Sequence, residues 1–134
     1  MAKKLTHVGI AVKDLDAASR VFCKLLGQED PSREIVPDQR VKIAFFQTGG
    51  TSVELTAPTS PDSPIAKFLE KRGEGVHHLS FEVDDIRAEL KRLKAEGFQP
   101  IDDEPRIGAG GCWIAFLHPK STNGVLIEIS QKRS

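Results

Sequence analysis

The sequence predicts an α+β fold made of two copies of one βαββ module, because the chain repeats itself. HVGIAVKDLDAA, which begins at His7, aligns with HLSFEVDDIRAE, which begins at His78, at an offset of 71 residues. The later segments also match, with three extra residues in the second half: IAFFQ and VEL at 43–47 and 53–55, IAFLH and IEI at 114–118 and 127–129. A unit of half this length buries too little apolar surface to fold alone, so we expect one domain over residues 1–134.

Length and composition describe an ordinary globular chain. Hydrophobic residues make up 39% and charged residues 28% of its 134 residues. The 19 basic residues balance the 19 acidic ones and give no net field for nucleic acid or an anionic membrane, so we expect a small-molecule partner. No apolar run has membrane-spanning length, the N-terminus lacks a signal-peptide pattern, and Cys23 and Cys112 form no CxxC pair. These features predict a cytoplasmic protein with reduced thiols.

The first module is predicted to begin with a half-buried strand and an amphipathic helix. Residues 6–12 alternate between apolar and small or polar side chains, which is the period of a strand. A helix over about 16–26 follows, capped by Asp14 or Asp16 and ended by Gly27. Helical spacing assigns four residues to its inward face: Ala17, Val21, Phe22 and Leu25.

A hairpin is predicted to complete the first module. The proline-containing stretch 29–38 is expected to be a loop or an irregular edge, which leaves room for one short strand before residue 41. Strands at about 41–47 and 52–57 are joined through Thr48-Gly49-Gly50-Thr51, because glycine supplies the positive φ that tight turns need.

The second module repeats this plan after a connector helix. Ser63 caps the connector, Pro64 occupies its first position and Gly73 ends it. The elements of the second module are a strand, a helix and two strands, at about 77–83, 85–95, 112–118 and 124–130. The loop HPKSTNG is three residues longer than its counterpart, which a ligand would explain. We place the first module at 5–58, the connector at 63–73 and the second module at 76–131.

Strand parity places two histidines and two glutamates on one face. Side chains alternate faces along a strand, so the apolar residues that pack on the helices fix where their neighbours point. By this rule His78, Glu54 and Glu128 point away from the helices, and His7 is the equivalent of His78 in the repeat. Two imidazoles and two carboxylates in one groove form a ligand set for a divalent ion. We therefore interpret His7, Glu54, His78 and Glu128 as ligands of one metal.

The types of donor atom narrow the choice of metal and of ligands. Two nitrogens and two oxygens favour Co²⁺, Ni²⁺, Zn²⁺ or Mn²⁺ over Ca²⁺, which prefers oxygen alone. A lone histidine that opens a strand is more often structural, but here each histidine is matched by a strand glutamate, a residue that strands disfavour. His77 points to the opposite face, and His118 is expected to be a loop or substrate contact. GAGG at 108–111 lacks the context of a nucleotide-binding fingerprint.

Five segments resemble the methylmalonyl-CoA epimerase family of the vicinal oxygen chelate superfamily: HVGIAV, SVELTAP, DSPIAKFLEKRGEGVHHLSFEVDDI, EPRIGAGG and FLHPKSTNGVLIEI. This superfamily also contains glyoxalase I and the extradiol dioxygenases. The resemblance spans nearly the whole chain, and the connector block and the last hairpin are its most specific parts. It implies tandem βαβββ modules that form an open, barrel-like metal-binding groove, usually in a homodimer, with His7, Glu54, His78 and Glu128 as metal ligands.

The resemblance also implies a reaction, the interconversion of (R)- and (S)-methylmalonyl-CoA. Such an enzyme abstracts the proton at C2 through an enolate, with the help of a divalent metal for which Co²⁺ is favoured. Glu128 is the first candidate for the catalytic base, whereas Ile43 stands where certain members carry a catalytic glutamate. Arg106, Lys120 and Ser121 are candidates for contacts with the phosphates of the acyl-CoA thioester.

Two rival functions stay open. A glyoxalase I-type lactoylglutathione lyase would use a similar metal set on a glutathione hemithioacetal. A metal-free small-molecule binding protein of the same fold would need no ligand set. Assays with both substrates and metal analysis of the dialysed protein would separate the three functions.

Overall fold

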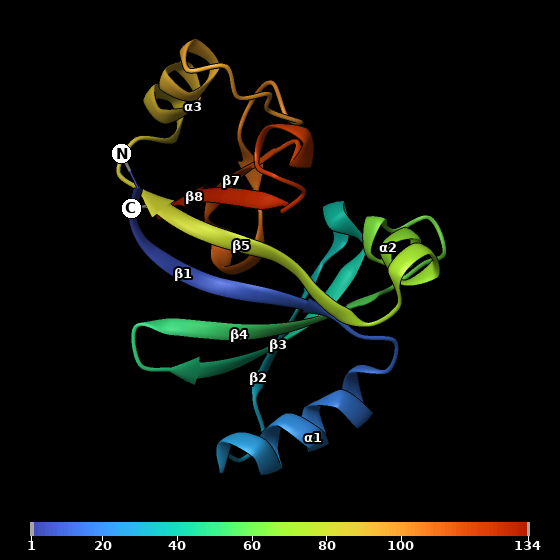
Figure 1. Ribbon diagram of the computed structural model, residues 1–134. Helices are drawn as coiled ribbons and strands as arrows, with labels where there is room; N and C mark the ends of the chain where they lie inside the picture. Colours follow the sequence, from blue (N-terminus) through green and yellow to red (C-terminus); the bar gives the residue numbers. More distant parts are fainter. Residues whose placement is uncertain (1, 134) are drawn as a thin grey trace. The chain divides into compact units, whose positions relative to one another are not determined.

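Eight strands, three α-helices and three short 3-10 helices make up the described part of the chain, residues 2–133 of a computed structural model (Figure 1). These residues form two units, one of residues 8–77 and the other of residues 2–7 with residues 78–133. Strands β1 (Ala2–Ala11) and β5 (Gly75–Val83) are each divided between the units. The α+β class is confirmed. The module bounds 5–58 and 76–131 follow the sequence repeat and differ from this division.

The unit of residues 8–77 contains the strand order β2-β3-β4-β1, two α-helices and one 3-10 helix. Besides the parts of β1 and β5, its elements are α1 (Leu15–Leu26), β2 (Ser32–Val36), η1 (Pro37–Gln39), β3 (Val41–Thr48), β4 (Thr51–Pro58) and α2 (Pro64–Arg72). The Val12 N–H donates to the Thr56 carbonyl at 2.9 Å, which ties the end of β1 to β4.

Helix α1 begins and ends as predicted, but its buried face differs. Asp14 caps it by accepting a hydrogen bond from the Ala17 N–H at 3.0 Å, and Gly27 ends it with φ 65°. Val21 and Leu25 were predicted to face inward, but they are 60% and 69% exposed. The residues that pack on the core lie on an adjacent stripe of the same helix: Leu15, Ala18, Phe22, Cys23 and Leu26. The prediction was wrong because spacings of three and four allow two overlapping stripes, and Phe22 lies on both.

The hairpin and the connector are confirmed. Strands β3 and β4 pair antiparallel across the turn at Gly49, where φ is 81°. The stretch predicted as loop or irregular edge contains the short strand β2, which pairs with β3. In α2, Ser63 accepts a hydrogen bond from the Ile65 N–H and Pro64 occupies the first turn, so the connector helix begins where its cap predicts.

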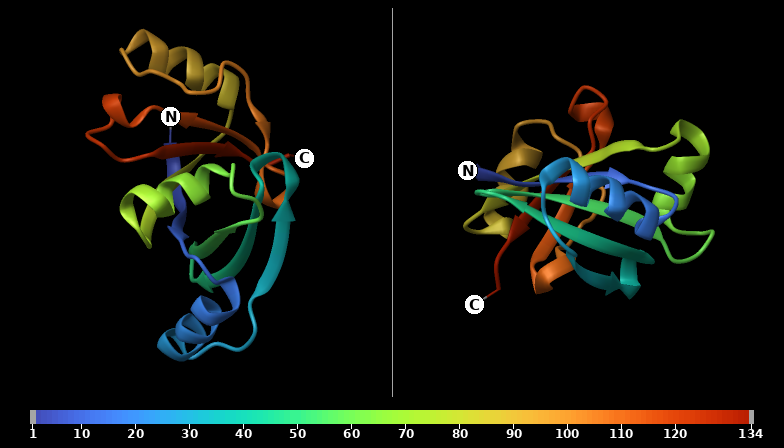
Figure 2. Two further views of the ribbon diagram at one scale, coloured as in Figure 1. Left: turned by 90° about the vertical axis from the view of Figure 1, so that its right-hand side faces the viewer. Right: turned by 90° about the horizontal axis from the view of Figure 1, so that it is seen from below.

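The unit of residues 2–7 and 78–133 contains the strand order β1-β5-β8-β7-β6 and helix α3. Its further elements are α3 (Ile86–Ala95), β6 (Arg106–Ile107), η2 (Ala109–Gly111), β7 (Trp113–Leu117), η3 (Pro119–Ser121) and β8 (Ile127–Gln131). Strand β8 pairs parallel with β5 and antiparallel with β7. Helix α3 lies along β7 and β8, as Figure 1 and the left view of Figure 2 show.

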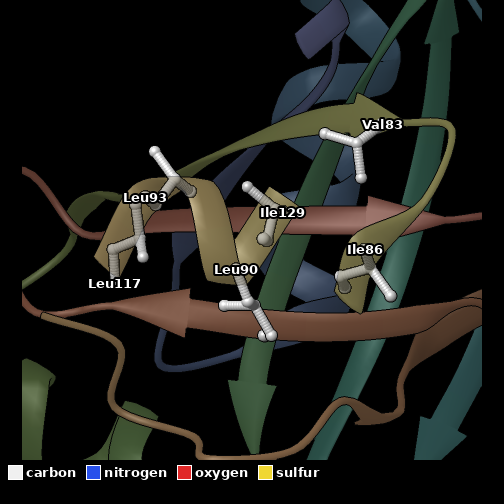
Figure 3. Packing of buried hydrophobic residues seen from close by; sticks show 7 residues of the cluster. Val83, Ile86, Leu90, Leu93, Leu117 and Ile129 are labelled. Atoms are coloured by element: carbon white, nitrogen blue, oxygen red, sulfur yellow. The ribbon is translucent and has the colours of Figure 1, made fainter. Parts of the chain in front are cut away.

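The core of this unit is the layer between α3 and the strands. Ile86, Leu90 and Leu93 of the helix are buried together with strand residues (Figure 3). The whole buried cluster consists of Val83, Ile86, Leu90, Leu93, Ala115, Leu117 and Ile129. Burying side chains of this size stabilises the fold by roughly 1.5–3 kcal/mol each. Because this layer fixes which strand residues face the helix, it also fixes which residues face away.

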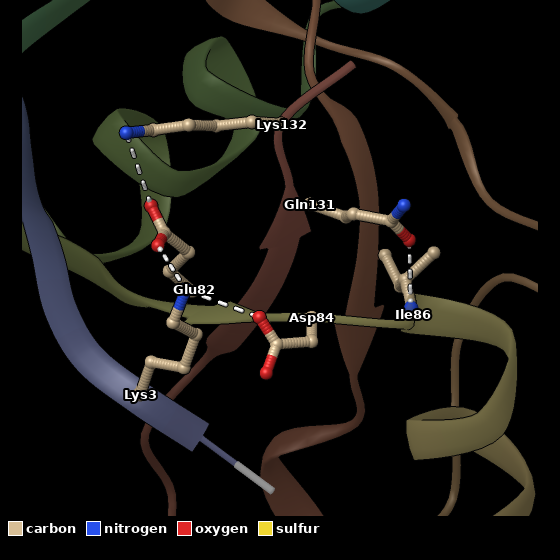
Figure 4. A network of polar contacts seen from close by, with 6 residues as sticks. All are labelled: Lys3, Glu82, Asp84, Ile86, Gln131 and Lys132. Carbon is tan, nitrogen blue, oxygen red and sulfur yellow. Dashed lines mark hydrogen bonds and ion pairs between the residues drawn. The ribbon is translucent and has the colours of Figure 1, made fainter. Parts of the chain in front are cut away.

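Polar contacts hold the start of α3 and the ends of the neighbouring strands (Figure 4). Asp85 caps α3 through the Ala88 N–H at 3.1 Å, and the Gln131 side chain accepts a hydrogen bond from the Ile86 N–H at 2.9 Å. The buried Glu82 lies between two lysines, 3.6 Å from Lys3 and 3.7 Å from Lys132. These contacts are structural.

No helix of residues 2–133 combines the length and the apolar character needed to cross a membrane.

Candidate metal centre

Three of the four predicted metal ligands converge within the unit of residues 2–7 and 78–133. His7 lies on β1, His78 on β5 and Glu128 on β8. The two Nε2 atoms of His7 and His78 are 3.0 Å apart, and His7 Nε2 lies 3.3 Å from Glu128 Oε1. Each of the three residues offers a ligand atom within 4.8 Å of the others. Three donor atoms from three separate strands therefore meet at one point.

The helix-side core explains why His78 and Glu128 point to this centre. Val83 on β5 and Ile129 on β8 belong to the cluster that packs on α3. His78 lies five residues before Val83, and Glu128 lies next to Ile129, so both point to the opposite face of their strands. They are 8% and 5% exposed. The parity prediction is confirmed for these two side chains.

Two further side chains, Ser80 and Phe116, complete the surroundings of the centre. Ser80 on β5 is the register partner of Glu128 in the parallel ladder and is fully buried. Phe116 on β7 is the register partner of Glu128 on the other side, and its ring lies edge-on to His78 at 5.8 Å. The repeat could have identified Phe116 as a neighbour of Glu128, because Phe45 occupies the same place opposite Glu54 in the first module. The centre is thus walled by an aromatic ring and a hydroxyl group.

Burial sets the protonation of the centre. It raises the pKa of Glu128 to about 7, while the Ser80 hydroxyl and the Arg106 charge pull that pKa down. Burial lowers the pKa of His7 to about 4, so His7 is neutral at neutral pH. The contact between His7 and Glu128 is therefore not an ion pair at neutral pH, although its 3.3 Å distance would suit one. A neutral imidazole has a free electron pair on one nitrogen, which is the form that binds metals.

The residues present fit a divalent metal ion. Two ligand atoms held about 2.1 Å from one ion, at right or tetrahedral angles, lie about 3.0–3.4 Å apart. The measured separations of 3.0 and 3.3 Å match this range. The buried Oε1 of Glu128 has no hydrogen-bond partner among residues 2–133, and such an atom is costly to bury unless something else binds it. Two imidazole nitrogens and one carboxylate oxygen suit a borderline divalent ion.

The fourth predicted ligand, Glu54, belongs to the other unit, and the converging group does not include it. Glu54 lies on β4 and is 7% exposed, with its Oε2 accepting a hydrogen bond from the Ser52 hydroxyl at 3.2 Å. It is therefore a buried strand carboxylate, as its counterpart Glu128 is. Its role as a ligand stays a prediction from the repeat.

Of the predicted substrate contacts, Arg106 acts on the centre through its charge. Arg106 lies on β6, and its Nε is 3.6 Å from Asp102 Oδ1. Its positive charge lowers the pKa of Glu128, although less than burial raises it. A cation whose charge acts on Glu128 would also attract a substrate carboxylate or phosphate bound there.

The other two candidates, Lys120 and Ser121, lie in the turn η3 after β7. The Ser121 hydroxyl donates to the His118 carbonyl at 2.9 Å and accepts from the Gln99 N–H at 3.3 Å. The Lys120 N–H donates to His118 Nδ1 at 3.1 Å. His118 and Ser121 thus stabilise the turn itself. Within this turn, the Lys120 ammonium is the candidate group for binding an anion.

Ile43 offers no proton-transferring group, as predicted. It lies on β3 opposite Thr56 and is 5% exposed. An aliphatic side chain cannot accept or donate a proton, so this position of β3 supplies no second base to the reaction.

Comparison with known proteins places the chain in a family. Residues 6–116 match the Glyoxalase/Bleomycin resistance protein/Dioxygenase superfamily, and the chain belongs to it. The ethylmalonyl-CoA/methylmalonyl-CoA epimerase of Cereibacter sphaeroides is 44% identical over 98% of this chain and 99% of its own length. The mitochondrial methylmalonyl-CoA epimerase of Homo sapiens is 40% identical over 96% of this chain and 73% of its own. Within the superfamily the chain belongs to the methylmalonyl-CoA epimerase family.

A solved structure agrees with this assignment. A variant of the Streptomyces coelicolor methylmalonyl-CoA epimerase, in complex with 2-nitronate-propionyl-CoA, has a TM-score of 0.94. It is 35% identical, and the match covers 100% of both chains. A probable lactoylglutathione lyase of Vibrio cholerae is only 23% identical. The resemblance to the epimerases is confirmed, and the glyoxalase I interpretation is the weaker one.

Proposed function

We propose that this chain interconverts (R)- and (S)-methylmalonyl-CoA by metal-assisted proton transfer at C2. The observation that carries the proposal is the convergence of His7, His78 and Glu128 in a chain of the epimerase family. Proton transfer next to a thioester needs a positioned base and stabilisation of the enolate charge. The centre offers one buried carboxylate and a set of donors that fits a cation.

Glu128 is the proposed catalytic base. A carboxylate that binds a divalent cation is deprotonated, so Glu128 would be ionised in the metal-loaded protein and could accept the C2 proton. A positioned general base contributes typically 10²- to 10⁴-fold to the rate. C2 of the substrate lies between a thioester and a carboxylate, so the electron pair left by the proton delocalises as an enolate. Epimerisation is complete when a different proton donor, in exchange with solvent, delivers a proton to the opposite face of that carbon.

His7 and His78 are the proposed nitrogen ligands of a divalent metal, with Glu128 and Glu54 as the oxygen ligands. When bound, such a metal supplies Lewis acidity that stabilises the enolate oxygen. Burial keeps His7 neutral, and the Phe116 ring packs edge-on against His78. Glu54 is included because the repeat makes it the equivalent of Glu128. We favour Co²⁺ among the ions that this donor set suits.

The test is an epimerase assay combined with elemental analysis of the dialysed protein. We expect turnover of methylmalonyl-CoA that a chelator abolishes and Co²⁺ restores. The Glu128→Gln variant should lose at least about 100-fold in rate, whereas Glu82→Gln, a matched buried glutamate held by Lys3 and Lys132, should retain activity. Turnover of the glutathione hemithioacetal in place of methylmalonyl-CoA would refute the proposal.

The proposal includes an acyl-CoA thioester as substrate and a homodimer as the assembly. Arg106 and Lys120 are the cations proposed to meet the anionic groups of the substrate, with Ser121 in the same turn as Lys120. The homodimer rests on the family resemblance alone. Sedimentation velocity at micromolar concentration tests it, and a species of 14.7 kDa at all concentrations would contradict it.

A further inference from the structure

Ser80 on β5 is a buried polar residue that the packing of the fold does not explain. Its side chain is 0% exposed, and its Oγ has no hydrogen-bond partner among residues 2–133. A hydroxyl group buried without a partner destabilises a fold, because it loses its hydrogen bonds to water. An alanine at this position would avoid that cost. The hydroxyl group therefore points to a function other than stability.

The register of the β5–β8 ladder places Ser80 beside Glu128. The two residues are partners in the parallel pairing of these strands. Ser80 also lies two residues after His78, and side chains at this spacing point to the same face of a strand. The Ser80 hydroxyl group thus belongs to the face of β5 and β8 that holds the candidate metal centre.

The hydroxyl group and the carboxylate lie within reach of each other without an aligned hydrogen bond. Neither Ser80 Oγ nor Glu128 Oε1 has a hydrogen-bond partner among the described residues. The hydroxyl group is nevertheless near enough to the carboxylate to lower the pKa of Glu128. Rotation about the Cα–Cβ bond moves a serine hydroxyl group among three staggered positions. Ser80 can therefore serve as a hydrogen-bond donor to this carboxylate.

A second serine–glutamate pair of the same ladder shows how the chain neutralises a buried carboxylate. Glu82 is the register partner of Ser130. The Glu82 carboxylate lies 3.6 Å from Lys3 Nζ and 3.7 Å from Lys132 Nζ (Figure 4). In the described part of the chain, no lysine or arginine lies at ion-pair distance from Glu128. The carboxylate of Glu128 is therefore the one of the two that suits a bound cation.

We infer that Ser80 is a positioning residue of the candidate metal centre, whose hydroxyl group donates a hydrogen bond to the Glu128 carboxylate when that carboxylate binds a divalent cation. The inference deepens the proposed function and rests on it, since that function makes Glu128 a metal ligand. A carboxylate that binds a cation keeps further acceptor sites on its oxygens. A donor to such a ligand fixes its orientation, and its removal typically lowers metal affinity by about 10–100-fold.

Metal binding without substrate tests the inference. Co²⁺ is titrated into the dialysed protein in competition with a chromogenic chelator. We expect the Kd of the Ser80→Ala variant for Co²⁺ to be about 10–100-fold higher than that of the parent protein. The matched control is Ser130→Ala, which removes a buried hydroxyl group from the same ladder and should leave the Kd unchanged. Equal Kd values for Ser80→Ala and the parent would overturn the inference.

Two variants of one shape separate the hydroxyl group from the packing at Ser80. Threonine and valine have nearly the same shape, so Ser80→Thr and Ser80→Val crowd the buried site equally, but only Ser80→Thr keeps a donor. We expect Ser80→Thr to bind Co²⁺ at least tenfold more tightly than Ser80→Val. Equal affinities of these two variants would show that packing alone matters at this position, and would overturn the inference.

Urea unfolding in the presence of a chelator gives a readout that a merely structural serine would fail. Ser80→Ala should be at least as stable as the parent protein without metal, because it removes a buried hydroxyl group that has no partner. The same variant should be less stable than the parent at a Co²⁺ concentration that saturates only the parent. A loss of stability by Ser80→Ala without metal would show that the hydroxyl group supports the fold itself, and would overturn the inference.

An epimerase assay on the same samples separates the inference from the proposed function. A parent protein that binds Co²⁺ more tightly than Ser80→Ala but does not epimerise methylmalonyl-CoA would refute the proposed function and leave the role of Ser80 standing. An active, metal-dependent parent whose Co²⁺ affinity is unchanged by Ser80→Ala would refute the role of Ser80 and leave the proposed function standing. A parent protein that binds no Co²⁺ would overturn both.

Discussion

Replacing Glu128 by glutamine tests the electrostatics of the metal centre in the metal-free protein. Glutamine has nearly the same shape as glutamate but cannot ionise. Burial raises the pKa of Glu128 from 4.5 to about 7, so the folded protein holds this proton at pH 5 and releases most of it by pH 8. A carboxyl group whose pKa is raised by folding favours the folded state below its unfolded pKa. That contribution is lost as the pH rises through the folded pKa.

The magnitude follows from the two pKa values. Each unit of pKa difference corresponds to 1.36 kcal/mol, so between pH 5 and pH 8 the parent should lose about 2–3 kcal/mol of unfolding free energy relative to Glu128→Gln. His7 stays neutral over this range because its pKa is about 4, and it is present in both proteins. Urea unfolding in the presence of a chelator, followed by circular dichroism, measures the difference.

The same experiment contains its control and its refutation. With saturating Co²⁺ the order should reverse, because the parent keeps the carboxylate ligand and metal binding stabilises the folded state. A stability difference between the parent and Glu128→Gln that is the same at pH 5 and pH 8 without metal would contradict the raised pKa. An unchanged order with Co²⁺ would contradict a ligand role for Glu128.

Three further substitutions give separate outcomes. His78→Ala should lower metal affinity by more than the roughly 10–100-fold typical of groups that only support a ligand. The control variant His118→Ala should leave metal affinity unchanged. Competition with a chromogenic chelator measures both affinities, and equal affinities of the two variants would show that His78 is not a ligand. Glu54→Gln should retain less metal after dialysis, as elemental analysis can show, and full retention would reject it as the fourth ligand. Glu89→Gln should lower the unfolding free energy by about 1–2 kcal/mol at pH 7 and by nearly nothing at pH 2. The reason is that two hydrogen bonds from Arg92, at 2.9 and 3.0 Å, hold the pKa of Glu89 down to about 2, so the stabilisation present above about pH 4.5 is lost as the pH falls through 2. Acid unfolding curves that stay parallel would contradict it.

The sequence predicted the features that local rules determine. From the repeat and the strand period we predicted that His78 and Glu128 point away from the helices and lie with His7 at one centre, as the structure shows. The predicted cap of the first helix was Asp14 or Asp16, and the structure has Asp14, whose side chain accepts a hydrogen bond from the free Ala17 N–H group. These predictions depend on residues close in sequence or on the internal repeat.

Other features depend on tertiary packing and were missed. Val21 and Leu25 are exposed because the helix stripe that begins at Leu15 packs on the core instead. Helical periodicity alone fits both stripes and does not show which of them is buried. The two-residue strand β6, which contains Arg106, is too short to show a period. The pairing of Ser80 with Glu128 was not predicted, since the parallel pairing of β5 with β8 joins residues far apart in the chain.

The most direct test of the account follows the C2 proton of methylmalonyl-CoA in D₂O, with protein stripped of metal and then reloaded. We predict no epimerisation by the stripped protein, recovery with Co²⁺, and solvent deuterium at C2 of the product, because the proton that Glu128 removes differs from the one returned. Elemental analysis of the same samples should show one metal ion per active site only when His7, His78 and Glu128 are intact. Full turnover by protein that contains no metal, or none by protein that is fully loaded, would contradict the account.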